Sequence, residues 1–171
     1  DFQLSADSSN LKLACGFGGD TADINISTGG IISTGQETSP DAGTSGITLN
    51  QGANDTNIIT LKSSDVDHPM TALFETDTYG VMQKHSGANG GLRVLGLSDD
   101  DPALILQGFA ESDSGSVNAS ANAIVHIDGR KSDGSTSVGG ISSNNLVAVS
   151  NDGTNQLMFT GDGQIYTNNS T

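Results

Sequence analysis

Short pairs of apolar residues at alternate positions recur along the first 62 residues, and Gly, Asn, Asp or Ser separates one pair from the next. A β-strand directs alternate side chains to the same face, so this pattern is typical of strands with one buried face. Gly or β-branched residues interrupt every candidate helix in this part of the chain. We predict short strands at Leu11/Leu13, Ile24/Ile26, Ile31-Ile32, Ile47/Leu49 and Ile59/Leu61.

The same alternation is denser in the second half of the chain. Residues 146–167 predict a three-stranded meander, because Asp-Gly pairs stand at hairpin positions in the turns Asn151-Asp152-Gly153 and Gly161-Asp162-Gly163. The strands of this meander start at Leu146/Ala148, Leu157 and Gln164. Further strands are predicted at Tyr79/Val81, Leu92/Val94, Leu104/Leu106 and Ala123/Val125/Ile127.

Two of these runs, residues 103–106 and 123–127, are apolar at odd and at even positions. A strand that is apolar on both faces needs cover from two directions. Either a compact sandwich forms here, or neighbouring chains cover the second face.

Residues 65–80 are the one stretch with the chemistry of a helix start. Asp67 is a suitable cap, Pro69 suits the first turn, and Met70, Leu73 and Phe74 recur at helical spacing. We therefore predict an all-β fold of short strands, in an extended, intertwined or sandwich-like fibre segment with at most one short helix near 67–75. The predicted division is a sparse, shaft-like β segment over 1–64 and a β-rich domain over 65–171 that ends in the three-stranded meander.

The composition changes this picture because it limits the core. Only 33% of the residues are hydrophobic and 4% are aromatic, against roughly 45–50% apolar in a typical soluble domain, a class that also counts Gly. Low hydrophobicity with a net charge of −14 also fits a disordered chain, but the regular alternation argues against disorder. We expect a thin core that is shared between copies.

The acidic charge balance limits the kinds of partner that the chain can bind. With 20 acidic and 6 basic residues, the chain repels phosphate backbones and anionic lipids, so we expect no nucleic-acid and no membrane partner. No apolar run approaches the ~20 residues of a membrane span. The sequence does not begin with Met, from which we expect a processed product or an excised piece.

Few residues suggest chemistry. Asp99-Asp100-Asp101 offers three carboxylates to Ca²⁺, but adjacent strand residues point to opposite faces, which favours a solvated acidic turn. The three histidines lack metal-ligand spacing, and His126 is predicted as a hydrogen-bonded strand residue. We expect no metal and no cofactor, and leave calcium binding at 99–101 open.

The remaining candidates have structural interpretations. Residues 128–134 hold Arg130 and Lys131 beside acidic residues, which suits an exposed hairpin turn with local ion pairs. The single cysteine, Cys15, is predicted to be buried, reduced and inert. A glycan-cleaving site needs paired carboxylates beside sugar-stacking aromatics, and Trp is absent. We predict no catalytic residues.

Several segments carry a resemblance to a known class of protein. They are His68-Pro69-Met70-Thr71, 75–80, 90–99, 151–154 and 159–163, with a lead-in at 47–52 and 61–66. Over roughly residues 37–165 the chain resembles repeat segments in tail-fibre-like structural proteins of environmental, marine-type tailed bacteriophages. The resemblance implies a homotrimeric virion fibre, and no catalytic residues to carry over.

The resulting expectation is a structural subunit of a virion fibre, on a tail or a head, that displays or forms a host-attachment element. Its expected partners are further copies in a trimer, other virion proteins and a host-surface receptor or glycan, at the virion surface or outside the cell. The alternative is a cell-surface filament subunit that lends a strand, because Phe2 and Leu4 share a face near the first residue. A glycan-degrading tailspike comes third. Replacing Ile105 or Val125 with Asp is expected to abolish assembly and folding together.

Overall fold

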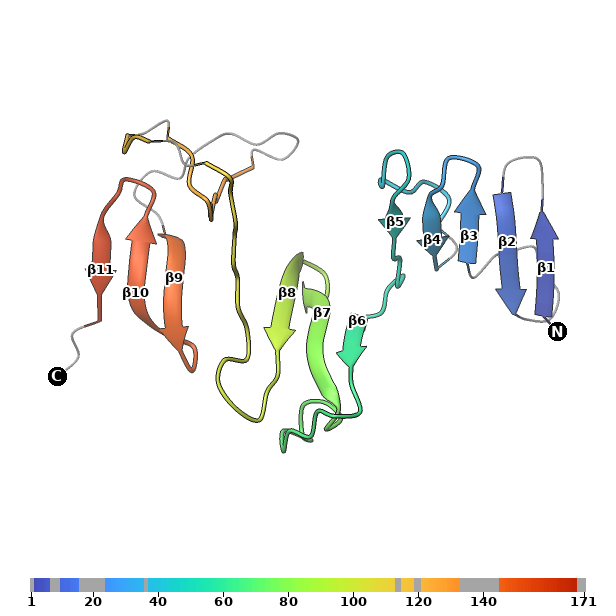
Figure 1. The fold of residues 1–171 in the computed structure, drawn as a ribbon, viewed down its shortest axis with the longest axis horizontal. Coiled ribbons are helices and arrows are strands. Elements are labelled where there is room, and N and C mark those ends of the chain that lie inside the picture. Colours follow the sequence, from blue (N-terminus) through green and yellow to red (C-terminus); the bar gives the residue numbers. More distant parts are fainter. Residues whose placement is uncertain are drawn as a thin grey trace. The chain divides into compact units, whose positions relative to one another are not determined.

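The computed structural model describes residues 2–6, 10–15, 24–35, 37–112, 115–118, 121–132 and 145–168. Within them the protein is all-β: eleven strands form three small sheets, and no helix occurs (Figure 1). The predicted fold class is thus confirmed. The chain divides into two compact units, Asp1–Ile105 and Leu106–Thr171.

The first unit begins with a five-stranded sheet in the order β1-β2-β3-β4-β5. The first three joins are antiparallel, and β5 adds to β4 in parallel through Ile32↔Ile47 and Ser33↔Thr48. The predicted strands over 11–49 are all present here. The strands are β1 (Phe2–Ala6), β2 (Asn10–Cys15), β3 (Ile24–Ser27), β4 (Ile32–Thr34) and β5 (Ile47–Thr48).

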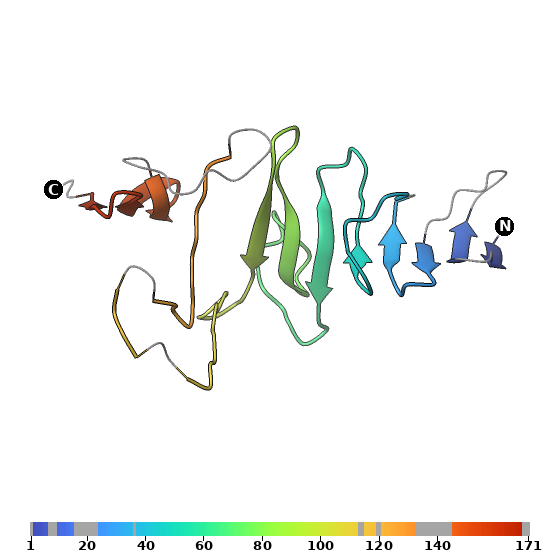
Figure 2. The same ribbon diagram turned by 90° about the horizontal axis from the view of Figure 1, so that it is seen from above.

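The second sheet of this unit is antiparallel, in the order β6-β7-β8 (Figure 2). It comprises β6 (Asn57–Lys62), β7 (Thr78–Ser86) and β8 (Gly90–Gly96). Residues directly opposite in register share a face of a sheet. Thr60, Val81 and Leu95 therefore lie on one face, and Ile59, Met82 and Val94 on the other.

Few side chains of the first unit are buried. Val81 and Leu97 are the buried apolar side chains of the described residues, and His68, from the loop between β6 and β7, is fully buried. The His68 ring nitrogen Nε2 lies 2.7 Å from the Thr78 carbonyl oxygen, and the Met70 N–H donates to Nδ1 at 3.3 Å. The predicted short helix amounts to turns, in which Leu73 and Phe74 N–H both donate to the Met70 carbonyl.

The second unit holds the predicted meander as a sheet in the order β11-β10-β9. Its strands are β9 (Asn145–Asn151), β10 (Thr154–Thr160) and β11 (Ile165–Thr167). Asp152 and Gly153 have φ of 46° and 74°, as a tight two-residue hairpin requires. Thr160 and Gln164 close the second turn, where the Thr160 N–H donates to the Gln164 carbonyl at 3.0 Å.

The strands predicted at Leu104/Leu106 and Ala123/Val125/Ile127 are wrong for this single chain, because both runs lie outside the strands. Their alternation and β-branched content favour a strand, yet no strand of the described chain pairs with them. His126 is correspondingly exposed and outside any strand, and it makes no hydrogen bond in the described structure, contrary to its prediction.

The predicted segments 1–64 and 65–171 differ from the two compact units. Their boundary falls in the loop between β6 and β7, which pair with each other. The division into a shaft-like segment over 1–64 and a β-rich domain over 65–171 stays a prediction.

Candidate functional site

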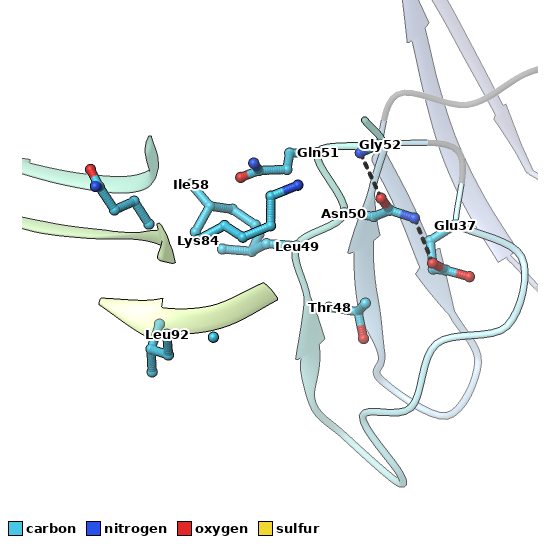
Figure 3. A pocket seen from close by; sticks show the side chains of 11 residues that line it. Glu37, Thr48, Leu49, Asn50, Gln51, Gly52, Ile58, Lys84 and Leu92 are labelled. Atoms are coloured by element: carbon cyan, nitrogen blue, oxygen red, sulfur yellow. Dashed lines mark hydrogen bonds between the residues drawn. The ribbon is translucent and has the colours of Figure 1, made fainter. Parts of the chain in front are cut away.

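A hollow of about 380 Å³, lined by both polar and apolar residues, lies in the first unit beside β5 and the β6-β7-β8 sheet. Figure 3 shows Glu37, Thr48 and Asn50 on one side of it and Ile58, Lys84 and Leu92 on the other. Glu37 lies in the β4–β5 connection, and Asn50 follows β5.

Asn50 ties the loops of this hollow together. Its Nδ2 donates to Glu37 Oε2 at 2.7 Å, its Oδ1 accepts from the Gly52 N–H at 2.8 Å, and its own N–H donates to Thr34 Oγ1 at 3.3 Å. Gly35, with φ of 64°, allows this approach, since a Cβ there would lie 1.9 Å from the Asn50 carbonyl oxygen. The wall is therefore a hydrogen-bonded brace between two loops.

The charged groups of the hollow are engaged within the chain. Hydrogen bonds from the Ser39 N–H and then the Asn50 amide hold the pKa of Glu37 below its ordinary value. Lys84 Nζ lies 2.6 Å from Asp55 Oδ1. Both charges have partners in the chain, so this wall suits hydrogen bonding to a hydroxyl-rich ligand better than acid–base chemistry.

A second hollow, of about 560 Å³, gathers carboxylates from two separate segments. Asp65 and Asp67 come from the loop before β7, and Asp99 and Asp100 from the turn after β8, with Tyr79 beside them. In the acidic turn the Asp101 N–H donates to Asp100 Oδ1 at 2.8 Å. Within the described ranges no three His, Cys, Asp or Glu side chains are grouped so as to hold a metal ion. Calcium binding at 99–101 stays open.

The third feature is apolar. A groove of about 230 Å³ lies on the Ile59–Met82–Val94 face of the sheet and is bordered by Ala103, Leu104 and Ile105. The chain passes close to the sheet here, because a Cβ on Gly96 would lie 1.9 Å from the Ala103 carbonyl oxygen. Leu61, Met82 and Val94 nonetheless remain exposed. This face lacks the cover that a core would give it.

The other residues considered from the sequence have simple surroundings. Arg130 Nε pairs with Asp128 Oδ2 at 2.7 Å, as predicted, but residues 128–132 form no hairpin turn after a strand, and 133–144 lie outside the described residues. Cys15 ends β2, and its side chain is outside the described part of the structure. His85 is exposed on β7, whereas His68 is fully buried.

The sequence did not indicate the Glu37–Asn50 brace or the burial of His68. Both depend on loops folding back, and loop contacts leave no periodic signal. A positive-φ glycine such as Gly35 next to a polar loop is the one local feature that hints at the brace.

No described segment forms a helix with the length and apolar character needed to span a membrane. Comparisons with protein-family models, with curated proteins and with solved structures found no match.

Proposed function

We propose that the chain is a structural, non-catalytic subunit of a virion fibre, on a tail or a head, that displays or forms a host-attachment element. The observation that carries the proposal is the combination of an all-β fold in three small sheets with a large apolar surface that the chain leaves uncovered. The resemblance of residues 37–165 to tail-fibre-like proteins supplies the setting.

Charge and chemistry support the same function. A net charge of −14 favours solubility and opposes unspecific aggregation. The hollow beside Asn50 offers amide groups, and its two charged side chains have partners within the chain. Such a surface suits contact with a receptor or glycan at a host surface.

The strand-lending filament receives less support. Residues Phe2–Ala6 already form β1 and pair with β2 from Phe2↔Cys15 to Ala6↔Leu11. Lending this strand to another copy requires it to leave that pairing first, so the five-residue strand is not free as β-augmentation needs.

The proposal is tested by immunogold electron microscopy of virus particles from the source sample, with antibodies raised against the purified chain. We expect gold on fibres that project from a tail or a head. Label confined to cell-surface filaments, or particles without label although the chain is present in the sample, would overturn the proposal. The genes beside its own give an independent check, because structural phage genes cluster.

A tailspike with glycan-degrading activity is distinguished by incubation of host glycans with the purified chain. We expect no release of reducing ends. The Asp99→Asn and Asp67→Asn variants are the matched controls if any release occurs, since both residues line the carboxylate-rich hollow.

A further inference from the structure

Two apolar segments have no backbone partner within the part of the chain that the structure describes. No hydrogen bond joins residues 103–110 or 122–127 to any part of the chain that the structure describes. Their side chains are also exposed: Leu106 by 76%, Phe109 by 88% and Ile127 by 66%. Figure 1 draws both segments without arrows.

These properties conflict with the sequence of the segments. Leu, Ile, Val and Phe dominate them, and such residues favour strands in which the backbone is paired and the side chains are covered. Exposed apolar side chains beside unpaired N–H and C=O groups form a template for another strand. We propose that residues 103–110 and 122–127 are the interface between copies of this chain, where they pair backbone to backbone with the same segments of a second copy.

Charge selects a second copy as the occupant. Copies with a net charge of −14 repel one another overall. Neither segment contains Asp, Glu, Lys or Arg, and the nearest charges, on Asp101, Glu111 and Asp128, lie beyond their ends. Within these two runs, therefore, two copies can approach without placing like charges opposite each other.

The number of unpaired segments in each chain also points to a second copy as the partner. Each chain carries two such segments, and in the second unit they already lie close, because a Cβ on Gly108 would lie 2.8 Å from the Ile124 carbonyl oxygen. A second copy brings the same number of unpaired groups with the same spacing. Symmetric association then pairs one edge of each segment in the same way in both copies.

The exposed apolar side chains of the two segments suit such an interface. Seven of them are more than half exposed: Leu104, Ile105, Leu106, Phe109, Ile124, Val125 and Ile127. Removing apolar surface from water is the main favourable contribution to association, so covering these side chains with the same segments of a second copy stabilises the assembly.

The inference deepens the proposed function, on which it rests only for its biological setting, because a fibre needs copies joined along its length. Hydrogen–deuterium exchange of the full chain over a dilution series tests it directly. We expect amides of 103–110 and 122–127 to exchange freely in dilute protein and at least about tenfold more slowly once light scattering reports association. Association without protection of these amides, or a chain that stays monomeric throughout, would overturn the interface.

Proline variants test the interface by a second measurement that does not depend on hydrogen–deuterium exchange. Leu106→Pro and Val125→Pro remove backbone donors that have no partner in the single chain, so the circular dichroism of the sheets is expected to remain. Each is expected to weaken association by about tenfold or more, since every copy in the assembly loses the bond. Glu111→Pro is the matched control, because it lies on the same connection outside the apolar run.

The outcomes separate the two proposals. Protected amides in a chain that labels no virus particle would sustain the interface and overturn the fibre role. Equal weakening by Glu111→Pro and Leu106→Pro would instead overturn the interface, because it would show that any stiffening of this connection suffices.

Discussion

The β6-β7-β8 sheet and the segments 103–110 and 122–127 contain similar apolar residues but differ in structure. The first forms a paired sheet, and the two segments form no strand. Val81 in β7 is 2% exposed, whereas Val125 is 52% exposed. The difference lies in the partners: β7 has a strand on each side, and the two segments have no strand beside them among the described residues. Apolar alternation therefore sets a tendency to form a strand, and a neighbouring strand decides whether it is realised.

Proline inserted in each region gives the largest expected contrast. Met82 lies in the middle of the central strand β7, so Met82→Pro removes a ladder hydrogen bond and is expected to unfold the sheet. The cost should reach the ~3 kcal/mol that proline imposes on regular structure. Circular dichroism of Met82→Pro and Leu106→Pro at the same low concentration measures the contrast. Equal loss of β signal in both would contradict it.

His68→Ala tests the contacts between the β6–β7 loop and the start of β7. The variant removes a fully buried side chain and leaves the Thr78 carbonyl and the Met70 N–H without their partner. We expect a loss of about 2–4 kcal/mol in the free energy of unfolding, measured by urea denaturation. His85→Ala, at an exposed residue of β7, is expected to change it by less than ~0.5 kcal/mol. Similar losses in both would show that the His68 contacts do not support the core.

Truncating one valine in each region separates folding from association. Val81→Ala is expected to lower the stability of the single chain by roughly 2 kcal/mol, because it empties space in a thin core. Val125→Ala is expected to leave that stability unchanged and to weaken association instead. Urea denaturation in dilute protein and sedimentation at higher concentration measure the two effects.

The exposure of these side chains also changes the outcome expected for the two aspartate substitutions considered from the sequence. Ile105 and Val125 are both exposed in the single chain. Ile105→Asp and Val125→Asp should therefore abolish assembly first, and loss of folding should follow only if the sheets depend on association. A folded monomeric Val125→Asp variant would separate the two events.

The strands that sequence reasoning recovered share one property: each has a partner nearby in the chain. The pairs at Leu11/Leu13 and Ile24/Ile26 are joined by short connections, and the meander turns carry Asp-Gly at positive φ. The run at 123–127 has equal periodicity but no adjacent partner. Periodicity reports the preference of a segment and contains no information about a missing neighbour.

The candidate site was less predictable because it consists of loop contacts. Glu37 and Asn50 are 13 residues apart, and their hydrogen bond depends on the path of the β4–β5 connection. His68 was one of three isolated histidines in the sequence, and only the return of its loop over β7 distinguishes it from His85. Such contacts follow from tertiary folding, which local patterns do not encode.

The smallest expected effect concerns the ion pairs between Lys62 of β6 and the loop that connects β6 to β7. Lys62 Nζ contacts the carboxylates of Glu75 and Asp77, the latter at 3.0 Å, and the hydrogen bond to Glu75, then that to Asp77, raises the pKa of Lys62 above its ordinary 10.5. A pKa that is higher in the folded than in the unfolded chain stabilises the fold fully below 10.5, and this contribution disappears as pH rises through the folded value.

Lys62→Met, which keeps an apolar stem, should therefore lower the unfolding midpoint slightly at neutral pH and not at all in strongly alkaline solution, because exposed pairs contribute little. Lys131→Met, on an exposed segment of the second unit, is the matched control and should show no difference at either pH. A gap between wild type and Lys62→Met that persists undiminished in alkali would mean that the loop is held by the packing of the Lys62 stem and not by its charge.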